Sequence, residues 1–225
     1  LVPSTGIIDS HGLMQALYYQ ARYNNVVFLF NYPVLDATYD GKGFVISSPK
    51  ETVWSEILIN AAGLGSADLA ASLGMDIEDC RYRLHLCKGE YFKINRRLPV
   101  NRLIYPIPGP VSLGIHLTID ISGGLKLGPS AFYVDQIDYT VNEFNQEAFY
   151  NAASKYLPGL KLNDLSPDYS GTRPKLQGPH DEEMKDFVIR EESKSGLPGL
   201  INLIGIESPG LTSCLAIARH VRRIL

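Results

Sequence analysis

Residues able to do chemistry are few in this 225-residue sequence and fall in four short stretches. No Ser-His-Asp order, metal-spaced group of histidines or pair of carboxylates stands out, so hydrolysis and metal catalysis are not indicated. What remains is an arginine before a proline, a histidine on an apolar strand, a turn of small residues after a strand, and a helix whose first turn is almost bare. The arginine and the helix start predict contact with anionic or electron-rich groups.

The helix start lies near the C-terminus. Leu200–Ile206 is an almost uninterrupted apolar run, typical of a strand covered on both faces. Ser208 is a suitable N-cap, and Pro209 suits the first helical position because its φ is set and it has no N–H to lose. Residues 210–213 are mostly small or polar, so a ligand could approach the free backbone N–H groups of the first turn. A well-capped helix that binds nothing is the alternative.

Arg173 and His116 are the side chains best suited to hold or deprotonate a small acid. Arg173 lies among small residues and directly before Pro174, where its planar guanidinium could bind a carboxylate through two parallel N–H groups. An ordinary solvated arginine is the alternative. His116 lies on an otherwise apolar strand, so it is either a hydrogen-bonded core residue or a general base.

A turn of small residues, Ala61-Ala62-Gly63, follows a strand predicted over residues 56–60. Small side chains let a backbone come close to a ligand, and Ser66 or Asp68 can then begin a short helix ending at Gly74. A plain strand-to-helix turn fits this pattern equally well.

Composition and charge argue against several classes of partner. With 45% apolar and 20% charged residues, the chain can bury the core of one or two globular domains. The net charge of −3 does not favour nucleic acid or an anionic membrane as a partner. No apolar run approaches the length of a membrane span. The three cysteines, Cys80, Cys87 and Cys214, match no zinc pattern and fit a reducing compartment.

Hydrophobic periodicity predicts a mixture of helices and strands. Helices are predicted over 11–23 and 144–157, and strands over 26–30, 34–39, 43–48, 83–92, 102–107, 113–121 and 125–127. Hairpin turns are indicated at Asp40-Gly41-Lys42-Gly43 and at Ser122-Gly123-Gly124. Strands joined by hairpins, with a lone helix among them, indicate an antiparallel sheet with a helix packed on one face.

Several motifs together resemble the D-amino-acid-oxidase-like, FAD-dependent oxidoreductases. NLIGIESPGLTSCLAIA (202–218) resembles the C-terminal flavin-contacting segment of that superfamily, and STGIIDSH, INAAGL, LCKGEYF, LIYPIP, LGIHLT and GTRPKLQGP resemble further stretches of it. Within the superfamily the chain looks most like the L-2-hydroxyglutarate oxidase/dehydrogenase group. The resemblance implies an α/β (α+β) chain that is part of a two-domain FAD-linked reductase fold, with a mostly antiparallel substrate domain.

The resemblance also implies roles for single residues. His116 would be the base that takes the substrate hydroxyl proton while hydride leaves C2 for flavin N5. Substrate contacts are implied for Arg173 and, less specifically, for Lys88, Tyr91, Tyr105 and Lys175. FAD contacts are implied for the turn (Ala61, Ala62 and Gly63) and for the helix start (Gly205, Ser208, Pro209, Gly210, Leu211 and Thr212). No metal ligand is expected.

A division into domains and an absent unit follow from the same resemblance. Residues 1–76 and 199–225 are expected to form a partial, discontinuous FAD-binding domain, and residues 77–198 a substrate-binding domain. The family places a βαβ unit with a Gly-rich phosphate turn ahead of STGIIDSH, and the sequence has no G-x-G-x-x-G at a strand-to-helix junction. A piece of roughly 100 residues is therefore expected to be missing on the N-terminal side, and without it FAD should be held poorly.

The expected activity is oxidation of a small 2-hydroxy acid, with L-2-hydroxyglutarate favoured. An amine or amino-acid oxidase of the same superfamily and a non-catalytic fragment are the alternatives. The sequence leaves open whether dioxygen or a quinone is the electron acceptor. A cytoplasmic location is expected, with peripheral contact at the inner membrane as the alternative.

Overall fold

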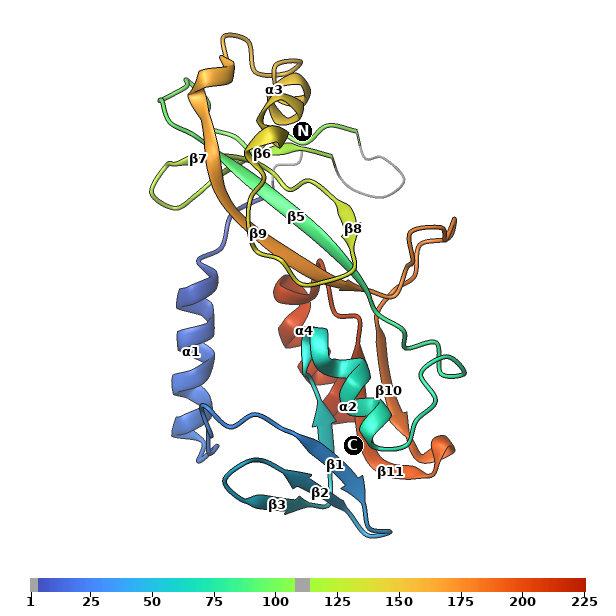
Figure 1. Cartoon of the computed structure of the whole chain (residues 1–225). Coiled ribbons are helices and arrows are strands. Elements are labelled where there is room, and N and C mark those ends of the chain that lie inside the picture. The colour runs from blue at the N-terminus through green and yellow to red at the C-terminus, as the bar shows by residue number, and fades with distance from the viewer. Residues whose placement is uncertain (1–3, 108–113) are drawn as a thin grey trace. The chain divides into compact units, whose positions relative to one another are not determined.

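The computed structural model describes residues 4–107 and 114–225, and the chain forms two compact units (Figure 1). The first unit comprises Leu1–Gln20 and Leu86–Thr172, and the second comprises Ala21–His85 and Arg173–Leu225. Helices and mostly antiparallel sheets make up the chain, which is the fold class expected from the sequence. The domain boundaries expected at residues 76/77 and 198/199 stay a prediction.

The first unit is built on a five-stranded sheet. Its strands follow the order β6-β7-β5-β8, and β9 also pairs with β5. Their bounds are β5 (His85–Ile94), β6 (His116–Ile119), β7 (Leu125–Gly128), β8 (Phe132–Val134) and β9 (Leu165–Lys175). The helix α3 (Gln146–Ala153) belongs to the same unit and is flanked by short 3₁₀ turns at Glu143–Asn145 and Leu162–Asp164.

The two faces of this sheet differ in character. The register places Leu127 beside both Phe92 and Leu117, and all three are fully buried in a core with Phe149 of α3. The rings of Phe92 and Phe149 lie 4.6 Å apart. Because side chains alternate along a strand, Lys126 must point to the opposite face. The face toward α3 therefore holds this apolar core, and the opposite face carries Lys126.

The second unit contains two three-stranded sheets. One is antiparallel: β1 (Asp36–Tyr39), β2 (Phe44–Ser47) and β3 (Thr52–Ser55). In the other, β11 (Leu197–Ile204) lies between β10 (Val188–Glu192), to which it is antiparallel, and β4 (Leu58–Asn60), to which it is parallel. Leu200, Ile201 and Ile204 of β11 are fully buried, as the apolar run predicted. A 3₁₀ turn (Gly63–Gly65) and α2 (Ser66–Ser72) follow β4, another 3₁₀ turn (Ser193–Ser195) follows β10, and α4 (Gly210–Ile224) follows β11.

Local signals in the sequence proved accurate. The first helix, α1 (Ser10–Tyr23), begins where predicted, and the Asp9 side chain accepts the Gly12 N–H at 3.0 Å. The predicted turn at residues 40–43 joins β1 to β2, with Asp40 Oδ1 accepting the N–H groups of Lys42 and Gly43. Asp120 closes the β6–β7 turn in the same way. Such side-chain acceptors explain why these two turns form.

Other expectations need correction. Residues 26–30 form no strand, and Val27 is 81% exposed, since no strand in the described part of the chain pairs with them. The strand expected over 102–107 is reduced to one bridge between Ile104 and Leu117. The helix expected to reach residue 157 ends at Ala153. The Pro108-Gly109-Pro110 sequence at the end of that expected strand, and the strand start expected at residue 113, lie outside the described residues.

Two strands that matter for the site were not predicted. β9 spans eleven residues but contains Gly171 and Pro174 and lacks a clear apolar alternation, so its sequence reads as a loop. β10 is short and ends in charged residues. Across the described residues, no helix combines the length and apolarity needed to cross a membrane.

Candidate functional site

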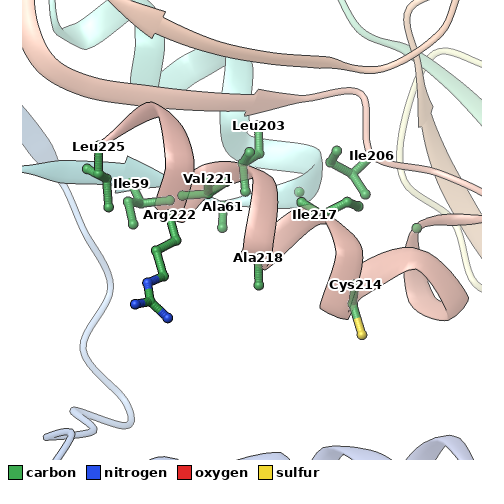
Figure 2. A pocket seen from close by; sticks show the side chains of 12 residues that line it. Ile59, Ala61, Leu203, Ile206, Cys214, Ile217, Ala218, Val221, Arg222 and Leu225 are labelled. Carbon is green, nitrogen blue, oxygen red and sulfur yellow. The ribbon is translucent and has the colours of Figure 1, made fainter.

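The second unit contains a cavity of about 630 Å³ beside α4 (Figure 2). Ala61, Gly63 and Gly210, three of the predicted cofactor contacts, lie in its wall. The rest of the wall comes from β4, β11, α4 and the residues that directly follow β11 and α4: Ile59, Leu203, Ile206, Cys214, Ile217, Ala218, Val221, Arg222 and Leu225. The fold thus brings together two stretches about 150 residues apart in the sequence, around a volume in the usual range for small-molecule sites.

Two glycines are required by the local packing near this cavity. Gly205 has φ +71°, and a Cβ there would lie 2.7 Å from Leu176 Cγ. A Cβ at Gly210 would lie 2.5 Å from Ile206 Cγ2. Any other residue at either position would force the neighbouring side chain to move. The connection from β11 to the first residue of α4 therefore contains two positions, 205 and 210, that glycine fits best.

The helix start differs in detail from the expectation. Pro209, not Ser208, is the N-cap of α4, since its backbone (φ −99°, ψ 38°) is not yet helical. Its side chain makes no capping hydrogen bond, because proline has no side-chain acceptor. The hydroxyl of Thr212 donates back to the Pro209 carbonyl at 3.0 Å. Within residues 4–107 and 114–225, the backbone N–H groups of Leu211 and Thr212 have no acceptor. These two N–H groups are what the first turn of α4 can offer an electron-rich ligand.

Lys175 lies close to this turn and is already paired. It is 7% exposed, and its ammonium lies 2.9 Å from Glu207 Oε1. Glu207 in turn accepts the Gly210 N–H through its backbone carbonyl. Lys175 therefore braces the connection between β11 and α4, and its role in substrate binding stays a prediction.

Arg173 lies on β9 and is half-buried. In the described ranges its guanidinium makes no hydrogen bond or ion pair. A half-buried arginine without a protein partner retains all of its donors for a ligand. This is the state expected of a carboxylate-binding side chain, although the assignment stays a prediction.

His116 and Tyr105 lie together in the first unit. His116 is 8% exposed, and its ring stacks on that of Tyr105 with centroids 4.5 Å apart. His116 Nδ1 lies 3.2 Å from the Gly114 carbonyl oxygen. Because a carbonyl can only accept, this contact favours the tautomer with the proton on Nδ1, and Nε2 is then the nitrogen that can take up a proton. Within the described ranges, no three His, Cys, Asp or Glu side chains cluster as metal ligands would.

A group that the sequence did not assign lies near Tyr91. The rings of Tyr91 and Tyr169 stack at 4.5 Å, and Lys126 Nζ lies 4.8 Å from the Tyr169 ring centroid. Lys126 also pairs with Asp168 at 3.0 Å. The register places Lys126 on the face of the sheet that His116 shares. This signal is absent from the sequence because it depends on how β6 and β7 align.

Lys88 lies apart from these residues, on the face that carries α3. It is 3% exposed and lines a second cavity, of about 660 Å³, with Glu90 and Asp138. Lys88 Nζ lies 2.6 Å from Asp138 Oδ2 and 3.6 Å from Glu90 Oε1. Glu90 also accepts hydrogen bonds from Asn142 and Asn145 at the start of α3. The structure thus separates Lys88 from His116, and its role as a substrate contact stays a prediction.

Replacing Asp138 by asparagine should make stability less sensitive to acid. The hydrogen bond from Lys88, together with those from Thr140, lowers the pKa of Asp138 from 3.8 to about 2. Since the folded pKa is the lower one, this stabilisation is present above the unfolded pKa and is lost as the pH falls through the folded pKa. Urea midpoints at pH 7 and pH 2.5 should therefore differ less in Asp138→Asn than in the wild type. Asp135→Asn, an exposed carboxyl on the same loop, is the control, and an unchanged difference for Asp138→Asn would contradict the assignment.

Several known proteins are similar to this chain in sequence. The mitochondrial L-2-hydroxyglutarate dehydrogenase of Arabidopsis thaliana is 36% identical over 98% of this chain and 54% of that protein. A glycerol 3-phosphate dehydrogenase of Caloramator mitchellensis is 28% identical over 98% of this chain and 44% of that protein. The chain spans about half the length of these relatives.

Solved structures agree on the fold. The L-alpha-glycerophosphate oxidase of Mycoplasma pneumoniae, with FAD bound, matches 94% of this chain and 54% of its own with a TM-score of 0.75 at 22% identity. The L-proline dehydrogenase of P. horikoshii matches 95% of this chain and 54% of its own with a TM-score of 0.76 at 15% identity. A family model described as FAD dependent oxidoreductase (DAO) matches residues 1–224. Since that match covers nearly the whole chain, the protein belongs to the DAO family of FAD-dependent oxidoreductases.

Proposed function

We propose that this chain is part of an FAD-dependent dehydrogenase that oxidises a small 2-hydroxy acid, with L-2-hydroxyglutarate as the favoured substrate. The observation that carries the proposal is the 36% identity to the Arabidopsis L-2-hydroxyglutarate dehydrogenase across 98% of the chain. The 28% identity to a glycerol 3-phosphate dehydrogenase supports a second candidate substrate, glycerol 3-phosphate. An amine or amino-acid oxidase of the same family is a third.

The cavity beside α4 fits part of a flavin cofactor. Its apolar wall suits a flat aromatic ring system. Gly210, in that wall, begins the helix whose next two residues, Leu211 and Thr212, carry N–H groups that would suit an electron-rich edge. Gly63 and Gly210 add no side chain to its wall. When bound, FAD would accept the hydride that leaves C2 of the substrate.

His116 and Arg173 would act on the substrate itself. Nε2 of His116 can take the proton of the substrate hydroxyl, because the Gly114 carbonyl favours the proton on Nδ1. Arg173 can bind the carboxylate beside C2 through two parallel N–H groups, since no protein group occupies its donors in the described ranges. Tyr91 and Tyr105 are further proposed substrate contacts. The proposed electron acceptor is dioxygen or a quinone, and the proposed compartment is the cytoplasm, although the name of the Arabidopsis relative places that protein in mitochondria.

A substrate panel tests this proposal. The full-length protein encoded by the gene is assayed with FAD and an artificial electron-accepting dye. Its kcat/KM for L-2-hydroxyglutarate should be at least about tenfold above that for glycerol 3-phosphate, glycine or L-proline, which corresponds to roughly 1.4 kcal/mol in transition-state binding. D-2-hydroxyglutarate is the matched control, because it has the same charges with C2 inverted. A preference for glycerol 3-phosphate or for an amino acid would overturn the assignment to 2-hydroxy acids.

A further inference from the structure

A chain of buried hydrogen bonds runs through the second unit beside the Ala61–Gly63 turn. Asn60, the last residue of β4, is the register partner of Asn202 on β11. Asn60 Nδ2 donates to Asn202 Oδ1 at 2.9 Å, and Asn202 Nδ2 donates to Glu192 Oε1 at 3.0 Å. The Tyr82 hydroxyl donates to the same carboxylate oxygen. Each of these four side chains is at most 1% exposed, so every missing bond would leave a polar atom without water.

Asn60 makes hydrogen bonds to the backbone within the Ala61–Gly63 turn and shortly after it. Its Nδ2 donates to the Ser66 carbonyl at 2.8 Å, and its Oδ1 accepts the Ala62 N–H at 3.3 Å. Its neighbours Ile59 and Ala61 line the cavity, whereas Asn60 does not. The side chain of Asn60 therefore anchors, from the buried side, the turn whose other side faces the cavity.

Glu192 fixes the direction of all these bonds. Its two oxygens accept from Tyr82, from Asn202 and from the Ser195 hydroxyl at 3.2 Å. Because a carboxylate only accepts, Asn202 must turn its amide nitrogen toward Glu192 and its oxygen toward Asn60. Asn60 then turns its nitrogen toward Asn202, which leaves its oxygen for the turn. Burial of the Tyr82 ring, with the bond to Glu192 and its negative charge, raises the pKa of Tyr82 and keeps the hydroxyl a donor.

We infer that Asn60, Asn202 and Glu192 are positioning residues that hold the Ala61–Gly63 turn in the shape that lines the cavity. They act through hydrogen bonds and lie behind the turn. The importance of that shape for FAD rests on the proposed function, whereas the hold on the turn does not.

Asn202→Asp tests the inference in the cofactor-free chain. At pH 8 it would set a carboxylate against Glu192 in place of the Nδ2 donor, so that the bond between residues 202 and 192 is replaced by repulsion, although residue 202 can still accept from Asn60. Hydrogen exchange of the backbone amides at residues 62–66 should become about tenfold faster or more, as expected when a buried hydrogen-bonded group loses its partner. Asn145→Asp is the matched control, because Asn145 Nδ2 donates to buried Glu90 in the first unit at 2.6 Å. Equal exchange at 62–66 in the two variants would overturn the inference.

A rescue experiment separates positioning from general destabilisation. In Glu192→Gln/Asn202→Asp the glutamine amide can donate to the new carboxylate, which still accepts from Asn60. The double variant should therefore recover most of the lost protection at 62–66, and its failure to do so would overturn the role of Glu192. If Asn202→Asp does not fold, Asn202→Ser, which is uncharged and too short to reach both partners, is judged by the same exchange criterion.

Titration of the wild type and the Asn202→Asp variant with FAD, followed by flavin fluorescence, then distinguishes the positioning role from the proposed cofactor contact of the turn. Lost protection together with weaker FAD binding supports both. Lost protection with unchanged FAD affinity supports the positioning role and overturns the cofactor-facing role of the turn.

Discussion

Replacing Arg173 by lysine should lower kcat/KM for L-2-hydroxyglutarate toward the loss of about 30-fold to several thousand-fold that is expected when a charge-assisted pair worth roughly 2–5 kcal/mol is lost altogether. Lysine keeps the charge but offers a point in place of a planar fork, so the carboxylate is held less firmly and C2 is no longer aimed at the flavin. In the described ranges Arg173 makes no hydrogen bond or ion pair with the protein. Its replacement should therefore leave the melting temperature and the flavin content almost unchanged.

Arg96, an exposed arginine that is paired within the protein, provides the comparison. Arg96 donates to Asp164 at 2.7 Å and also to the Gly159 carbonyl. Arg96→Lys should lower stability slightly and leave kcat/KM unaltered, which is the opposite pattern. Steady-state kinetics, melting temperature and bound flavin measured on both variants decide the matter. Near-normal kcat/KM in Arg173→Lys would end the carboxylate-binding role.

The parts of the fold that the sequence predicted are those with local causes. The run from β11 into α4 carries its own signals: a continuous apolar strand and a Ser-Pro-Gly break before a helix. The β1–β2 and β6–β7 turns are set by Asp40 and Asp120, whose side chains bond to backbone groups two to four residues away. Interactions of such short range are visible in a sequence.

Interactions that depend on register are not visible in this way. Asn60 and Asn202 are 142 residues apart and meet because β4 and β11 pair in parallel. Lys126 shares a face with His116 because β6 and β7 align as they do. Residues 26–30 have the composition of a strand, but a strand needs a partner, and the described residues supply none. A single sequence does not specify these pairings.

Lys88 and Tyr91 show a constraint that the sequence alone carries. Lys88 and Tyr91 were both predicted to contact substrate, yet they lie three residues apart on the single strand β5. Side chains an odd number of positions apart point to opposite faces of a sheet. The parity of their numbers alone therefore excludes a shared face, and the structure places Lys88 with Glu90 and Asp138.

Replacing Gly210 by aspartate should weaken FAD binding more than any other change at the start of α4. Two effects oppose each other. An acidic residue in the first turn stabilises a helix by about 0.3–1 kcal/mol through the helix dipole. A Cβ at this position would lie 2.5 Å from Ile206 Cγ2, and overpacking of this kind costs roughly 1–3 kcal/mol. The steric term is the larger, so the wall of the cavity should shift.

The new carboxylate adds an effect that a methyl group does not. It can accept hydrogen bonds from the N–H groups of Leu211 and Thr212, and it would then occupy the place proposed for the electron-rich edge of the flavin. Gly210→Ala isolates the steric term, and the further change from alanine to aspartate isolates the charge. FAD affinity should fall in the order glycine, alanine, aspartate at position 210. In Gly210→Asp protein that still binds FAD, the reduction potential of the flavin should also fall, because a nearby negative charge disfavours the reduced flavin. Flavin fluorescence titration and redox titration of the three proteins provide the measurements. If the alanine and aspartate variants have equal affinities for FAD, and the bound flavin has the same reduction potential in both, the flavin does not face this helix start.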